Sequence, residues 1–149
     1  MRIPHRRAVL APFALLAVLL PAAAAAADST EVRGAAILEH PCGQTAVKHM
    51  GLLHAGKFDE AFALATPEVQ AQWQAMPAPE RKRIFKAMKD MSETEAAFSA
   101  EIKSYGVLVI EGDAATLTVE KKTKTENGTV TETQTQRYAI GAEGCRITT

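Results

Sequence analysis

The sequence predicts an α+β fold, in which N-terminal helices pack on a curved, four-stranded antiparallel meander. Two observations lead to this prediction. Apolar residues in the first half of the chain recur at spacings of three and four, as in helices. In the second half they alternate with polar residues, and two dipeptides, Gly112-Asp113 and Asn127-Gly128, are typical of hairpin turns. Because the helices precede the strands rather than alternate with them, we expect the helices to cover one face of the sheet.

The first 27 residues have the three-part pattern of a secretory signal peptide. A basic start that includes Arg6 and Arg7 precedes an apolar run from Ala8 to Leu20, and small residues lead to a cleavage site after Ala27. This run is shorter than the ~20 residues that a membrane-spanning helix needs, so we expect no membrane span after cleavage. The arginine pair leaves both general secretion and twin-arginine export open.

The chain therefore divides into a signal peptide (1–27), a loosely assigned segment (28–43) and a single domain (44–149). Loss of the three signal arginines leaves 14 basic and 17 acidic side chains. Such a balance lacks the basic footprint of a nucleic-acid-binding protein, so we exclude that class of partner.

Two cysteines, Cys42 and Cys145, lie near opposite ends of the predicted mature chain. In an oxidising compartment an even number of cysteines favours a disulfide, and two free thiols are the alternative. Closing a loop of about 100 residues stabilises a fold by about 4–5 kcal/mol on the chain-entropy model. The signal peptide and the cysteines together predict a protein exported to a bacterial periplasm or secreted.

Four helices are predicted between residues 44 and 91. The first ends before Gly56 and places Val47, Met50 and His54 on one face, and the third starts at Thr66-Pro67. The predicted ranges are 44–55, 57–65, 66–76 and 79–91.

The segment 92–104 fits two patterns. Ser92 followed by Glu95 matches a capping box, which favours a helix. The alternation of Phe98, Ala100 and Ile102 with polar residues favours a strand. We predict a strand from about Phe98, because its apolar face then continues through Leu108 without a change of register.

The two turns fix a register for the meander. A turn at Gly112-Asp113 places Leu108 opposite Leu117, and a turn at Asn127-Gly128 places Leu117 opposite Tyr138 and Ala115 opposite Ile140. Both registers put five apolar residues on the buried face: Leu108, Leu117, Val119, Tyr138 and Ile140. A fourth strand is predicted at 145–148.

Two stretches, "GLLHAGKFDEAFALATPEVQAQW" and "VLVIEGDAATLTVEKKTKTENGTVTETQTQRYAI", resemble exported domains of the nuclear-transport-factor-2-like (cystatin-like) superfamily, in particular bacterial lumazine-binding-like domains of unknown function. The resemblance covers about residues 45–149 and contains no catalytic motif. In that family the last strand often carries a Gly-x-Trp-x-Ile pattern, whereas this chain has Gly144-Cys145-Arg146-Ile147. The resemblance implies a cone, in which a bent sheet wraps around the first helix, and it implies no particular ligand.

The sequence contains no serine elbow, glycine-rich phosphate loop or paired metal motif, and it predicts no cofactor. We therefore favour a non-enzymatic domain that binds a small apolar ligand or a protein partner, with Trp73 and Tyr138 as candidate ligand-binding residues. One alternative is an enzyme of the isomerase or dehydratase kind that uses Tyr138 inside the cone. The other is a periplasmic metal-handling protein that uses His40, His49 and His54, which are soft ligands near Cys42. Neither the ligand, the partner nor the oligomeric state follows from the sequence.

Overall fold

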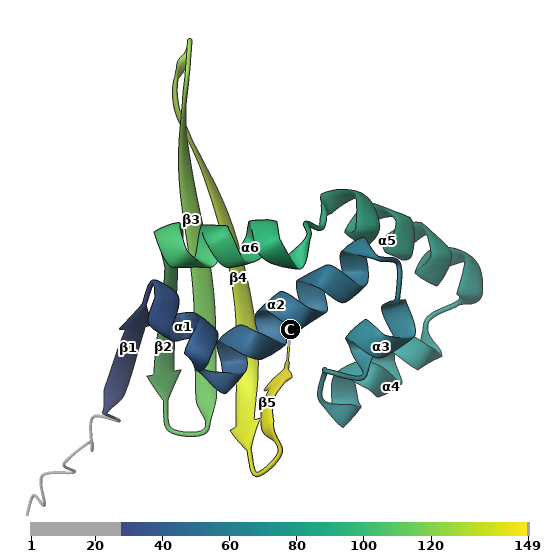
Figure 1. Ribbon diagram of the computed structural model, residues 1–149. Coiled ribbons are helices and arrows are strands. Elements are labelled where there is room, and N and C mark those ends of the chain that lie inside the picture. Colours follow the sequence, from purple (N-terminus) through teal and green to yellow (C-terminus); the bar gives the residue numbers. More distant parts are fainter. Residues whose placement is uncertain (1–27, 149) are drawn as a thin grey trace, which may run out of the picture.

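The computed structural model describes residues 28–148, so the predicted signal peptide and its cleavage site lie outside the described residues. Six helices and five strands make up this part of the chain, which is an α+β fold as predicted (Figure 1). In chain order they are β1 (Ser29–Arg33), α1 (Ala35–Glu39), α2 (Pro41–His54), α3 (Phe58–Phe62), α4 (Pro67–Ala75), α5 (Ala78–Met91), α6 (Glu95–Tyr105), β2 (Gly106–Glu111), β3 (Ala114–Thr125), β4 (Gly128–Gly141) and β5 (Gly144–Ile147).

The five strands form one antiparallel sheet in the order β1-β2-β3-β4-β5. The last four are the predicted meander, and β1 adds an edge strand that pairs with β2, Val32 lying opposite Leu108. This fifth strand comes from the segment that the sequence left loosely assigned. The prediction of four strands was therefore one strand short.

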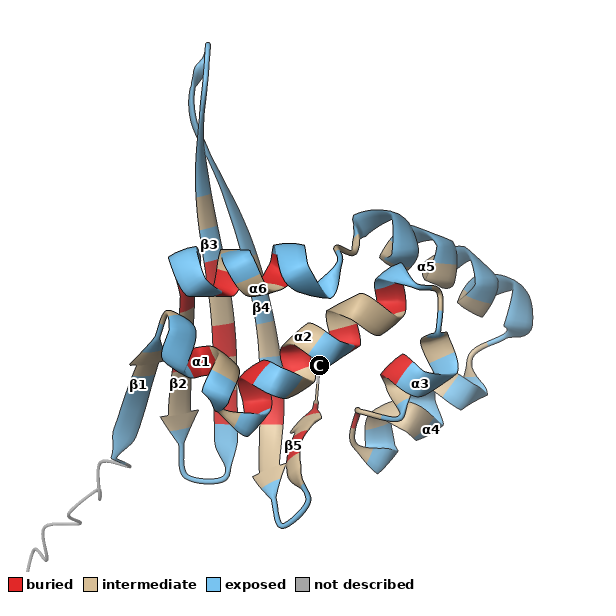
Figure 2. Ribbon diagram, viewed as in Figure 1, coloured by how far each residue is buried: buried red, intermediate tan, exposed pale blue. Residues whose placement is uncertain are grey.

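Helices α1, α2 and α6 lie across one face of the sheet, and the core is the layer between them and the strands (Figure 1). Figure 2 shows buried segments on α2, α6 and β3 where these elements face one another. The opposite face carries threonine and charged side chains, which are intermediate or exposed. One covered and one solvated face is usual for an antiparallel sheet. The largest side chains that are fully buried are Tyr138, Ile37, Ile102, Leu108, Leu117 and Cys42.

The first predicted hairpin register is confirmed, since Leu108 pairs with Leu117. The second is shifted by two residues: Leu117 lies opposite Gln136, and Ala115 lies opposite Tyr138. The cause is the position of the turn. Thr125 and Gly128 form its closing pair, whereas a turn at Asn127-Gly128 would be closed by Glu126 and Thr129. Because side chains alternate with a period of two, a shift of two residues leaves every side chain on its predicted face.

The predicted strand at 98–105 is wrong, since these residues belong to α6. The Thr94 hydroxyl accepts a hydrogen bond from the Ala97 amide at 3.2 Å and caps the helix, two residues beyond the cap predicted at Ser92. Phe98 and Ile102, one helical turn apart, are both buried, whereas Ala100 between them is exposed. The segment is rich in alanine and glutamate and holds one β-branched residue, so its helix propensity prevails over its period-two pattern.

Helix α2 buries a different face from the one predicted. Its buried residues include Cys42, Ala46, His49 and Leu53, at spacings of four, three and four. His54 is exposed at the end of the helix, where its Nδ1 lies 3.0 Å from the carbonyl oxygen of Ser92. The face is therefore rotated by one residue, about 100° around the helix axis.

Helices α3, α4 and α5 lie beyond the β5 side of the sheet (Figure 1), and aromatic rings from the three helices pack against one another. Phe58 stacks on Phe85 with ring centroids 3.9 Å apart, and Phe62 stacks on Trp73 at 4.0 Å. No residue of α4 or α5 is buried. This part of the molecule is thus held by aromatic stacking and by its contacts with α2, not by a core of its own. Within residues 28–148, no helix is both long enough and apolar enough to cross a membrane.

Candidate functional site

A cavity of about 570 Å³ lies between helices α2, α5 and α6 and the strands β3 and β4. Its volume is in the range of small-molecule binding sites. The helices contribute His49, Met50, Leu53, Met88, Met91, Ser92 and Phe98 to its wall, and the strands contribute Leu117, Val119, Glu132, Gln134, Thr135 and Gln136. The wall is thus mainly apolar on the helix side and carries most of its polar groups on one strand.

The pairing register of β3 and β4 explains why the sheet side of the cavity wall has an apolar half and a polar half. Leu117 and Val119 point toward the helices and are buried, and their partners across the ladder are Gln136 and Gln134. An apolar β3 therefore lies beside an amide-bearing β4. The two glutamines have the same parity as buried Tyr138, which was the signal in the sequence for a polar patch on the covered face.

His49 is the buried polar residue of the described chain, with 8% of its surface exposed. Its place on the buried face of α2 points its ring into this cavity. Burial lowers the pKa of His49 from 6.5 to about 4, so the imidazole is uncharged at neutral pH. Among the described residues, no side chain or backbone group forms a hydrogen bond with the ring.

Three methionines line the same cavity, one from α2 and two from the last turns of α5. Met88 and Met91 are three residues apart, so they share a face of α5. Met91 has 72% of its surface exposed and lies at the mouth. Met88 and Met91 were not predicted as site residues, because nothing in the local sequence pattern shows that α5 packs against α2.

The two predicted ligand-binding residues, Trp73 and Tyr138, lie in different places. Trp73 packs on Phe62 and lines a second, smaller cavity of about 240 Å³ with Asp59 and Arg81. Tyr138 is 1% exposed in the sheet core. Neither residue lines the larger cavity.

The Tyr138 hydroxyl has no hydrogen-bond partner among the described residues, and burial raises the pKa of this phenol. No described carboxylate or imidazole is therefore within hydrogen-bonding distance of it.

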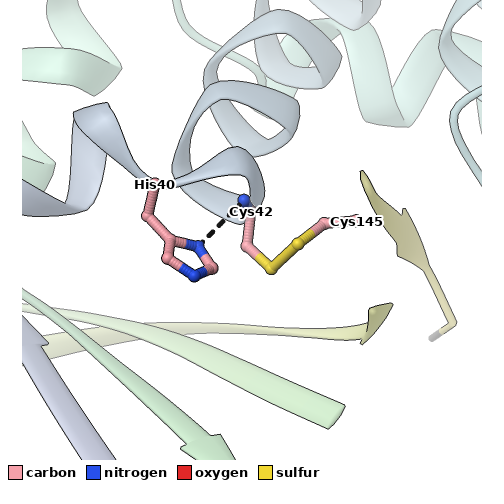
Figure 3. Close-up of side chains that lie close together, drawn as sticks. All are labelled: His40, Cys42 and Cys145. Carbon is pink, nitrogen blue, oxygen red and sulfur yellow. Dashed lines mark hydrogen bonds between the residues drawn. A yellow bond between two sulfur atoms is a disulfide. The ribbon is translucent and has the colours of Figure 1, made fainter. Parts of the chain in front are cut away.

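The predicted disulfide between Cys42 and Cys145 is present and joins the first turn of α2 to β5, with Cα atoms 4.9 Å apart (Figure 3). Such a bond is typical of proteins outside the reducing cytoplasm. The His40 ring lies beside it, and its Nδ1 accepts a hydrogen bond from the Cys42 amide at 3.2 Å (Figure 3). Potential ligand atoms of these three residues lie within 4.8 Å of one another. With both sulfurs in the disulfide, however, no thiolate is present to bind a metal ion.

The three histidines of the metal hypothesis are not brought together. His40 caps the start of α2 and His54 ends it, which separates them by about 21 Å at the helical rise. His49 lies between them and faces the cavity alone.

Comparisons of the chain with protein-family models, curated proteins and solved structures found no match. Membership of the nuclear-transport-factor-2-like superfamily therefore stays a prediction from the sequence.

Proposed function

We propose that this protein is an exported, non-enzymatic domain that binds a small, mainly apolar molecule in the cavity between α2, α5, α6 and the sheet. The observation that supports this most is the cavity itself: about 570 Å³, with methionine, leucine, valine and phenylalanine side chains as most of its wall. Burying an apolar surface there gains about 25 cal/mol per Å² removed from water. The nuclear-transport-factor-2-like fold remains part of this proposal.

The polar groups of the wall indicate the shape of the ligand. His49 and the amides of Gln134 and Gln136 can each donate and accept hydrogen bonds without carrying a charge at neutral pH. An anionic group placed against Leu117 and Val119 would lose its hydration with no cationic side chain in the wall, whose one charged residue is Glu132. The expected ligand therefore has an apolar body and an uncharged polar group, such as a hydroxyl or a carbonyl.

Export is supported by two independent features. The described chain holds a disulfide, and the sequence before it has the pattern of a signal peptide. The periplasm and the cell exterior are the two locations that fit both.

The test uses a neutral fluorescent probe, phenylnaphthylamine, which brightens in apolar surroundings. Val119→Phe fills the floor of the cavity, whereas Val109→Phe adds the same ring on the opposite face of the sheet, where Val109 pairs with Thr116. We expect Val119→Phe to weaken probe binding at least tenfold and Val109→Phe to change it less than twofold.

Circular dichroism and thermal melting show whether both variants remain folded. Equal probe affinity in the two variants, or no brightening with the unmodified protein, would overturn the proposal. Mass spectrometry of small molecules extracted from protein purified out of its own compartment then identifies the natural ligand.

A further inference from the structure

The distribution of methionines in this protein is uneven. Residues 28–148 contain four, Met50, Met76, Met88 and Met91, and three of them line the cavity of about 570 Å³. They come from two helices that are far apart in the sequence and in contact in the fold. Leucine would fill such a wall equally well, so packing alone does not require methionine. The three thioether sulfurs are therefore candidate ligands.

The same wall holds His49, which is more than nine-tenths buried and has no hydrogen-bond partner among residues 28–148. Among the described residues, the fully enclosed side-chain atoms without a partner are Glu93 Oε2 and the Tyr138 hydroxyl oxygen, not the His49 nitrogens, so the His49 ring stays open to a ligand in the cavity. Methionine sulfur cannot satisfy the ring well, because a thioether is a weak acceptor. A metal ion can satisfy both the imidazole nitrogen and the neighbouring sulfurs.

We propose that the helix side of the cavity is a binding site for Cu(I), with the imidazole of His49 and the thioether sulfurs of Met50, Met88 and Met91 as ligands. Thioether and imidazole ligands together select Cu(I) among the common biological metals. This site replaces the set of His40, His49 and His54, which α2 holds too far apart.

The helices can present this set from two sides. His49 and Met50 are successive residues of α2, and both face the cavity. Met88 and Met91 lie on one face near the end of α5, which packs against α2. Methionine has three rotatable bonds, so its sulfur reaches an ion between the helices without movement of the backbone.

The surroundings favour Cu(I) over Zn(II). Zinc prefers thiolate, imidazole and carboxylate ligands. Here both cysteines are in the disulfide, and the wall offers one imidazole and one carboxylate, that of Glu132 on β4. In an oxidising compartment, thioethers are soft ligands that form no disulfides.

This inference shares the cavity with the proposed function but does not depend on it. Replacing methionine by leucine removes the sulfur and keeps an apolar side chain of similar volume. Such variants separate the two activities, because an apolar probe should still bind after Cu(I) binding is lost.

The test is a competition for Cu(I) between the protein and the chromophoric chelator bicinchoninate, with ascorbate as a reductant that leaves the disulfide intact. We expect the unmodified protein to withdraw one equivalent of Cu(I) from the chelator. The double variant Met88→Leu/Met91→Leu should bind at least tenfold more weakly, and Met76→Leu, the matched control outside the cavity, should stay within twofold of the original affinity.

A second variant, His49→Leu, should also lose Cu(I), and X-ray absorption at the copper edge should show sulfur and nitrogen neighbours in the unmodified protein. The proposal is overturned if the protein fails to compete with the chelator, or if the double variant and Met76→Leu bind Cu(I) equally well. If the unmodified protein binds Cu(I) but does not bind phenylnaphthylamine, only the proposed function is overturned.

Discussion

Gly43 lies where the first turn of α2 passes the backbone of α1, and a side chain does not fit there. A Cβ atom at this position would be 1.9 Å from the carbonyl oxygen of Ile37. The obstacle is backbone and not a flexible side chain, so it cannot move aside cheaply. Gly43 thus permits the close approach that buries both Ile37 and Cys42.

We expect Gly43→Ala to lower the free energy of unfolding by about 1–3 kcal/mol, because the added methyl group forces α1 and α2 apart. Urea denaturation measures the change. Gly141→Ala is the matched control, since a Cβ atom there meets nothing within 4 Å. Similar stability for the two variants would show that α1 and α2 are not packed as described.

His49 couples stability to pH. Its pKa is about 4 in the folded chain and 6.5 when exposed, so between these values the unfolded state binds one more proton. Above pH 6.5 His49 is uncharged in both states and does not reduce the free energy of unfolding. As the pH falls from 6.5 toward 4, protonation of the unfolded state lowers this free energy. The expected slope is about 1.4 kcal/mol per pH unit, beyond what the carboxylates contribute.

Denaturation curves from pH 7 to pH 4.5 test this expectation on three proteins. His49→Leu should lose this component of the slope, and His54→Gln, which changes an exposed histidine, should keep it. An unchanged slope in His49→Leu would mean that the ring is hydrated in the folded chain.

At the residue scale the sequence predicted the residues whose role depends on chemistry alone. Cys42 and Cys145 were paired from their number and the inferred compartment. His49 was singled out only as a metal ligand with His40 and His54, and neither its burial in the cavity wall nor the role of Gly43 was predicted, because the environment of each is created by segments that come together only in the fold.

Helix α6 shows how one element can fit two patterns. The period-two arrangement predicted a strand, yet Phe98 and Ile102 also fit the same face of a helix. The alanine-rich composition and the cap at Thr94 decide between them. The apolar pattern alone could not decide, because positions four residues apart, such as Phe98 and Ile102, share a face in both a helix and a strand.

Thr94→Ala should destabilise the protein by about 1 kcal/mol, because it removes the side-chain cap that Ala97 uses. Ser92→Ala is the control: its hydroxyl bonds the Lys89 carbonyl at the end of α5 and does not cap α6. Thermal or urea unfolding followed by circular dichroism measures both. A greater loss in Ser92→Ala would support the cap that the sequence predicted and contradict the observed one.

The β3–β4 hairpin shows that the sequence determines the buried face of a strand more reliably than its pairing partners. The turn was misplaced and the partners were wrong by two residues, but the buried face was correct. Alternation of side chains specifies the face, whereas the position of the turn specifies the partner. The cavity wall depends on the partner, which is why Gln134 and Gln136 were not expected beside Val119 and Leu117.

Over the whole molecule, one covalent bond ties the beginning of the helical layer to the end of the sheet. Cys42 and Cys145 are 103 residues apart in sequence. Replacing both by serine should lower the free energy of unfolding by about 4–5 kcal/mol on the chain-entropy model. Urea denaturation with matched buffers compares this variant with the original; a loss below about 1 kcal/mol would mean that the unfolded chain is already compact.

The cavity itself is a property of the whole molecule. It exists because the segment α3–α5 lies beyond the sheet edge and brings the end of α5 against α2, and the space beside these two helices extends to β3 and β4. Helices α2 to α5, the order of strands β2 to β5 and the buried face of the sheet followed from the sequence, whereas β1, α1 and α6 did not. The placement of α5 did not follow either, because none of its residues is buried and a stripe on one helix does not show which element it packs against.

The proposed function requires the cavity between α2, α5, α6 and the sheet to bind an apolar molecule. The most direct measurement is the NMR spectrum of the protein labelled at its methionine methyl groups, recorded during addition of phenylnaphthylamine. We predict that the signals of Met50, Met88 and Met91 shift together and saturate, while that of Met76 stays in place. Saturating probe that moves none of the three cavity signals, or moves Met76 equally, would contradict the account.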